Sequence, residues 1–165
     1  MAGPSCSVLA SMPCSPERLI EELVTLTASS REKDWLSIAD TRAIGGTYEG
    51  EGRPFIWFHE SRDADDLRTI AEILRIEPQQ EIGLAAMCSQ AVDHQILGEI
   101  ALWLAEKTAG FVDLGGYEDL IPPGIPGTVA RVPYDTAAGW TAECMVLDRT
   151  AMHAWLASPA FRMVK

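Results

Sequence analysis

Short apolar runs typical of β-strands alternate along this chain with longer segments in which apolar residues recur at the spacing of an α-helix. Their order predicts the elements β-α-β-β-α-β-α-β-β-β-α. Elements mixed in this way pack as helices on one sheet, because each has an apolar face to bury. We therefore expect an α+β fold with a mixed, largely antiparallel sheet on which the helices pack. The predicted strands are residues 6–9, 35–39, 54–60, 81–88, 111–114, 128–134 and 140–147.

The first six predicted elements follow the split βαββαβ order of a ferredoxin-like layer. Ser15 followed by Pro16 is typical of a helix start, and Gly110 is typical of a helix end. The predicted N-caps of the four helices are Ser15, Ser61 or Asp63, Asp93 and Asp148. The predicted sheet-facing positions of the first three helices are Leu19, Ile20, Leu23, Leu67, Ile70, Leu74, Ile96, Leu97, Ile100 and Leu104.

The size of the chain and its charge limit both its organisation and its partners. A chain of 165 residues fits one domain spanning 1–165, and no repeat or linker divides it. It carries 24 acidic and 13 basic residues, a formal net charge of −11. A surface of this sign repels phosphate backbones and anionic membranes, so nucleic acid and lipid are not expected partners. It suits a cationic partner, although it serves solubility alone equally well.

The chain has no segment that predicts export or membrane insertion. No run approaches the roughly 18–20 apolar residues that span a bilayer, and the N-terminus lacks the basic segment of a signal peptide. We therefore expect a cytoplasmic protein. In that compartment the four cysteines, Cys6, Cys14, Cys88 and Cys144, are expected to be reduced thiols.

The sequence lacks the residue patterns that mark catalytic and metal sites. The three histidines, His59, His94 and His153, have no second ligand at the spacing that zinc requires, and no GxSxG, CxxC or HExxH motif occurs. The glycine-rich segment 45–52 holds two glutamates and no lysine and precedes a strand, so it predicts a flexible hairpin tip, not a phosphate-binding loop. We expect a chain that is not an enzyme and that needs no cofactor or metal.

Acidic residues gather in two places. The larger group spans the glycine-rich loop, the end of a strand and the start of the second helix. Acids in a first helical turn stabilise the helix dipole, but this group exceeds that need, so it is either a partner-binding face or a solvated one. The second group joins a tyrosine to two acids on a loop. The candidate binding residues are Glu49, Glu51, Glu60, Asp63, Asp65 and Asp66 in the first group and Tyr117, Glu118 and Asp119 in the second.

Several longer segments are similar to those of a known family. They are the opening MAGPSCSVL, the run DHQILGEIALWLAEKTAGFVDLGG, the loop PPGIPG, the segment VPYDT and the ending AWLASPAFRMVK. On these segments the chain resembles a family of small acidic bacterial proteins of uncharacterised function that look like immunity proteins of polymorphic-toxin systems. The resemblance covers most of the chain, most clearly residues 93–165. Its motifs are structural, so it assigns no catalytic residue.

The resemblance implies a cytosolic antidote that binds a cognate toxin or effector domain and blocks its active site or substrate entrance. A nuclease toxin is favoured, because immunity proteins often cover basic nuclease sites with acid, and a toxin acting on nucleotides such as NAD is the next expectation. Two other classes stay open. One is an enzyme whose polar residues converge on a deep pocket from separate elements. The other is a small-ligand-binding or regulatory domain with a preformed apolar pocket or a dimer cleft.

Overall fold

The computed structural model describes residues 3–59, 62–116, 121–136 and 139–164. Helices are interspersed with single strands and runs of strands along these residues, and a short 3₁₀ turn, Arg42–Ile44, lies between the third and fourth strands. The strands are β1 (Ser5–Ala10), β2 (Ser30–Glu32), β3 (Trp35–Asp40), β4 (Glu49–His59), β5 (Gln80–Ala86), β6 (Phe111–Asp113), β7 (Val129–Asp135) and β8 (Thr141–Leu147). The helices are α1 (Pro16–Leu26), α2 (Ala64–Leu74), α3 (Ala91–Lys107) and α4 (Arg149–Leu156).

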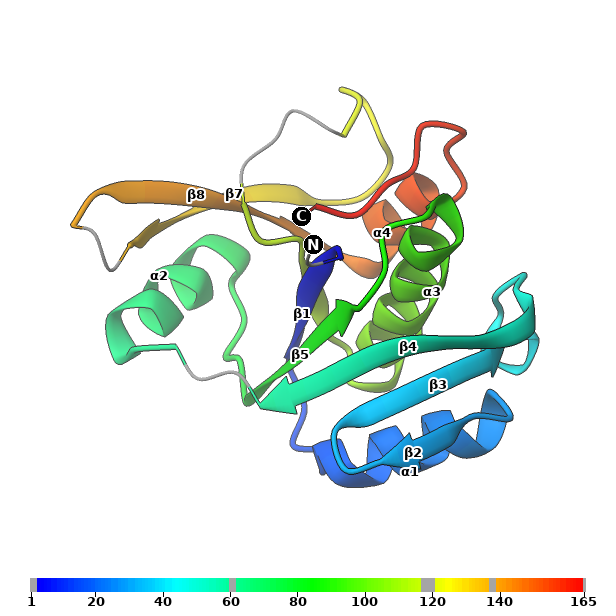
Figure 1. The fold of residues 1–165 in the computed structure, drawn as a ribbon. Helices are drawn as coiled ribbons and strands as arrows, with labels where there is room; N and C mark the ends of the chain where they lie inside the picture. Colours follow the sequence, from blue (N-terminus) through cyan, green and yellow to red (C-terminus); the bar gives the residue numbers. More distant parts are fainter. Residues whose placement is uncertain (1–2, 60–61, 117–120, 137–138, 165) are drawn as a thin grey trace.

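The eight strands form one sheet in the order β2-β3-β4-β5-β1-β6-β8-β7. Every pairing between neighbouring strands is antiparallel. The two ends of the chain meet near the middle of the sheet, where the amide of Ser5 donates to the carbonyl of Val164 at 3.1 Å (Figure 1). The predicted α+β class is confirmed, and the sheet is antiparallel throughout the described pairings.

The helices divide unequally between the two faces of the sheet. α1, α3 and α4 cover one face and enclose the main core, which includes the fully buried Ile96, Leu97 and Ile100 of α3. α2 lies over the other face, where Ile70 packs with Leu9 and the β7–β8 pair in a second, smaller core. In Figure 1 α2 stands apart from the other three helices, below β7 and β8. One face is therefore well covered and the other only in part.

The prediction that the first six elements form a ferredoxin-like arrangement is wrong. That arrangement places β1 between β4 and β5, but here β5 lies between β4 and β1, and β6 pairs with the other edge of β1. It also requires α1 and α2 on the same face. β5 accepts β4 as a neighbour because Gly83 leaves room for the ring of Phe58 directly opposite. The order of the elements along the chain does not determine the order of the strands in the sheet or the face on which α2 packs.

The predicted helix starts are confirmed at Ser15 and Asp148, each of whose side chains accepts a hydrogen bond from the first turn. Asp63 caps α2, and Ser61, the alternative, lies outside the described residues. The prediction that Asp93 is the N-cap of α3 is wrong. Gln90 takes that place, and Asp93 is the third helical residue of a capping box.

The end of α3 also differs from the prediction. Ala109 takes the left-handed conformation that glycine was expected to supply, with φ of 49°. The amide of Gly110 then donates to the carbonyl of Ala105 at 2.8 Å, as in a Schellman motif. A side chain at Gly110 would meet the carbonyl oxygen of Leu9, so glycine is needed there for the close approach to β1.

The glycine-rich segment 45–52 is tied to the core and is not a free tip. The carboxylate of Glu99 in α3, only 3 % exposed, accepts from the amide of Thr47 at 2.8 Å and from Thr41 Oγ1 at 2.5 Å. The added methyl of an alanine at Gly46 would stand 2.4 Å from Glu99 Oε2, so the loop can close on α3 only with glycine there. A buried carboxylate thus fixes the loop that precedes β4.

Candidate protein-binding face

Three strands leave part of the sheet open to solvent on the face that carries α2. Trp35 of β3 lies opposite Ile56 of β4, which lies opposite Ala85 of β5, and Phe58 lies opposite Gly83. Paired residues point to the same side, so these side chains share one surface, called here the open face. Trp35 is 47 % exposed and Phe58 is 37 % exposed. An exposed surface with two large aromatic side chains is typical of an interaction site.

A buried network of charges borders the open face. Arg62, which precedes α2, directs its guanidinium onto the sheet, where Nε donates to both oxygens of Glu81 at 2.9 Å. Its Nη2 donates to the carboxylate of Asp113. Ser7 completes the network by donating to Glu81 Oε1 at 2.5 Å. These contacts join the entry of α2 to β1, β5 and β6 and hold the helix start against the sheet.

The network contains one cation and two buried carboxylates. Burial acts to lower the pKa of Arg62, but the two carboxylates more than offset it, so this pKa lies above its ordinary value. Burial also raises the pKa of Asp113, although Arg62 acts against that shift. The pKa of Arg62 and the pKa of Asp113 are both raised, because one guanidinium balances the charge of only one of the two carboxylates. The same surroundings, burial first, raise the pKa of the Cys144 thiol to about 12, so this cysteine is a poor nucleophile.

Next to the network, two hollows meet at Tyr134 of β7. One, of about 250 Å³, is lined by Arg62, Asp66, Asp113, Gly115, Tyr134 and Cys144. The other, of about 550 Å³, is lined by Gly116, Pro133, Tyr134, Trp140, Thr141, Ala142 and Glu143. Trp140 is 59 % exposed. Aromatic side chains beside carboxylates suit a cationic group of a partner, because both kinds of group attract positive charge.

Three of the predicted binding residues lie together at the start of α2. Asp63 is the N-cap and accepts from the amides of Asp65 and Asp66 at 3.0 and 2.8 Å. The side chain of Asp65 is 85 % exposed and forms an ion pair with Arg68 at 3.0 Å. Burial, with the nearby carboxylate of Asp63, raises the pKa of Asp66. Asp66 therefore lies partly buried beside a second carboxylate.

The other predicted residues of the first group lie elsewhere. Glu49 and Glu51 are exposed near the start of β4, about 33 Å and about 26 Å from its end at the rise of an extended strand. Glu49 forms an ion pair with Arg42 at 2.7 Å. The structure thus separates them from Asp63, Asp65 and Asp66.

Glu60, and the second group of Tyr117, Glu118 and Asp119, lie outside the described residues. The two glycines that precede Tyr117, Gly115 and Gly116, line the hollows on either side of Tyr134. The root of that loop therefore lies beside Asp66.

A family model described as a family of unknown function, DUF6368, matches residues 2–165. The chain belongs to this family. No curated protein and no solved structure matches it. The identification covers nearly the whole chain and leaves the activity open.

Other polar side chains of this DUF6368 member stabilise the fold. Among the described residues, no three histidine, cysteine or acidic side chains are placed to hold a metal ion. His94 is half-buried, and its Nδ1 accepts from the amide of Met163 at 3.0 Å. His59 is exposed and pairs with Glu17 at 2.8 Å. Burial raises the pKa of Cys14 despite its place before α1.

None of the four cysteines of this DUF6368 member, all in the described part of the chain, forms a disulfide. Cys6 and Cys144 are buried, whereas Cys14 and Cys88 are half-exposed. In the described part of the chain, no helix combines the length and apolar character needed to cross a membrane.

Sequence reasoning missed the aromatic half of the surface. Residues 54–60 were predicted as a strand, but a strand that is apolar at five successive positions, here Pro54 to Phe58, presents apolar side chains to both faces. Phe55 and Trp57 are buried in the main core, which leaves Ile56 and Phe58 for the opposite face. The run of five successive apolar residues was therefore the sequence feature that could have indicated an apolar surface on the second face of the sheet. Nothing local in the sequence indicated that Arg62 would contact Glu81 and Asp113.

Proposed function

We propose that this protein works by binding another protein through the open face and the adjacent acidic start of α2. The observation that carries the proposal is the exposure of Trp35 and Phe58 on an ordered sheet surface that directly adjoins a set of carboxylates. Tryptophan and other aromatic side chains dominate the binding energy of protein interfaces, and acids beside them select a partner by charge.

The charge of the chain favours a basic partner over a second copy of itself. Two copies would bring together two surfaces of a chain whose net charge is −11, and like charges in an interface weaken association. Asp65 and Asp66 add local negative charge where the open face ends. A partner with apolar side chains surrounded by lysine or arginine complements both features.

A toxin domain with a basic active site has this chemistry. The resemblance to immunity proteins supports it, and so does the absence of any recognised catalytic motif in the sequence. The proposed role is therefore that of an antidote, which covers the active site or substrate entrance of a cognate toxin. The proposed compartment is the cytoplasm, where such a toxin would act on the cell that made it.

The experiment is to co-express the chain with the toxin domain encoded beside its gene. We expect the two proteins to co-purify and the toxin to lose its effect on cell growth. A chain carrying Trp35→Ser and Phe58→Ser should leave the toxin active. A neighbouring product that neither co-purifies with the wild-type chain nor is neutralised by it would contradict the proposal.

A further inference from the structure

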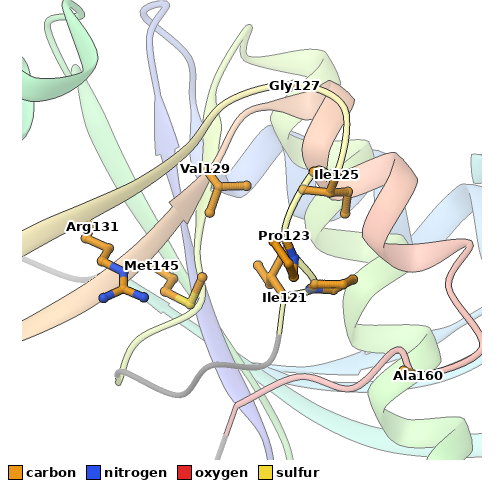
Figure 2. A pocket seen from close by; sticks show the side chains of 10 residues that line it. Ile121, Pro123, Ile125, Gly127, Val129, Arg131, Met145 and Ala160 are labelled. Carbon is orange, nitrogen blue, oxygen red and sulfur yellow. The ribbon is translucent and has the colours of Figure 1, made fainter.

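A third cavity lies on the opposite face of the sheet, away from the proposed binding surface. It has a volume of about 780 Å³, within the usual range for small-molecule sites. Figure 2 shows it between the proline-glycine loop and the β7–β8 pair, with Ile121, Pro123 and Ile125 on one side and Arg131 and Met145 on the other. Ala160 of the C-terminal segment also lines it.

The side chains that line the cavity are mostly apolar, although polar atoms form close to half of its exposed lining. Ile121, Ile125 and Val129 are half-buried and pack against the main core, while Met145 is 5 % exposed. The core therefore supports the side chains that face the cavity. An apolar molecule placed there would gain contacts on several sides and lose its contact with water.

Arg131 is the single charged residue among those that line the cavity. It pairs in register with Met145, so its side chain runs beside the apolar floor. The surrounding part of the chain also has an unusual charge. Residues 121–165 contain four of the 13 basic residues but only three of the 24 acidic ones. Residues 121–165 are therefore less acidic than the rest of this protein.

We propose that this cavity binds a small amphipathic carboxylate, with its apolar body against Ile121, Ile125 and Met145 and its carboxylate at Arg131. The apolar walls provide affinity for the body of the ligand. The guanidinium selects an acid over an alcohol or an amine of the same length, because a charge-assisted hydrogen bond is stronger than a neutral one. This binding is independent of the proposed protein partner, which uses the other face of the sheet.

The test is a calorimetric titration of the full chain with decanoate, decanol and decylamine. We expect saturable binding of one decanoate per chain, weaker binding of decanol, and no binding of decylamine. Arg131→Gln should weaken decanoate about tenfold and leave decanol unchanged, since it removes one charged contact. Arg149→Gln is the matched control, because it removes an exposed positive charge from the neighbouring helix α4 without touching the cavity lining.

Three outcomes would overturn the proposal. They are no saturable binding of decanoate, equal affinity for the acid and the amine, and equal effects of Arg131→Gln and Arg149→Gln. A fourth outcome would also contradict it: an Ile125→Asp variant that binds decanoate as tightly as the wild-type chain does, although the change places a negative charge in the cavity wall. Unfolding curves of each variant separate loss of binding from loss of the fold.

Discussion

At the scale of single residues, the network around Arg62 shows how the acidic helix start is held in place. The side chain of Arg62 is 16 % exposed, and those of Glu81 and Asp113 are 4 % and 1 % exposed. Apolar side chains in place of all three groups would stabilise the fold about as well as this buried network does. Removing only one of the three, however, leaves a buried charge without a partner. Arg62 therefore determines whether α2 can rest on the sheet.

Replacing Arg62 with methionine should destabilise the protein by about 3–5 kcal/mol, because two carboxylates would stay buried without their cation. Urea unfolding at neutral pH measures this change. The matched control is Arg68→Met on the same helix, whose side chain is 66 % exposed and pairs with Asp65. That variant should lose less than about 1 kcal/mol, as exposed ion pairs contribute little. Equal losses would show that the buried network does not hold the helix.

Asp113 predicts a specific dependence of stability on pH. Burial raises its pKa in the folded state above the ordinary value of 3.8, so between these two values the folded chain binds more protons than the unfolded chain. Stability from this group is therefore present at acid pH and is lost as the pH rises through that window. Asp113→Asn should remove this dependence of the unfolding free energy on pH. Unfolding free energies of both proteins from pH 3.8 upward test it, and an unchanged difference across the window would contradict the assignment.

At the scale of elements, the sequence predicted what depends on local patterns. Periodicity and capping located all four helices, and Ser15, Asp63 and Asp148 were predicted as caps. The short strand β2 was missed, since Ser30 to Glu32 has no apolar pattern and forms a strand only because β3 offers an edge. The position of β1 beyond β5, and the face chosen by α2, depend on contacts between distant residues, which no local pattern encodes.

The candidate site was predictable only in its local part. Asp63, Asp65 and Asp66 were recognised because they are three acids within four residues at a helix start. The closeness of Asp66 to Tyr134 and Gly115 arises from the pairing of β6 with β8 and of β8 with β7, so spacing along the sequence could not show it. Glu49 and Glu51 are near these acids in sequence, but the length of β4 carries them away.

The anchor at Glu99 is the element-scale feature that is easiest to test. Glu99→Ala removes the acceptor of Thr41, Thr47 and Gln95 and should cost about 1–3 kcal/mol of stability, because the buried hydroxyl of Thr41 would lose its carboxylate acceptor. The amide of Thr47 should also exchange its hydrogen faster with solvent. Glu106→Ala, an exposed position on the same helix, is the control. Unchanged protection at Thr47 would show that Glu99 does not fix the loop.

At the scale of the whole molecule, a strongly negative protein with one partly uncovered sheet face is suited to a basic partner. Reversing Asp65 and Asp66 to lysine should weaken binding to the co-expressed toxin several-fold and reduce the salt dependence of association, because both act through long-range attraction. The control is the reversal of Glu77 and Glu106, which changes the net charge equally at exposed positions outside the proposed surface. Equal effects of the two pairs would mean that only net charge matters.

Whether the open face contacts the proposed toxin is reported by the dissociation constant of their complex, measured by calorimetry. Trp35→Ser with Phe58→Ser should weaken binding at least about 30-fold, since aromatic hot spots contribute 2 kcal/mol or more. Met12→Ser with Ile73→Ser removes two equally exposed apolar side chains, 49 % and 43 % exposed, from outside the open face and should change the constant less than about threefold. Wild-type affinity of the Trp35 and Phe58 double variant, with its fold intact, would contradict the account.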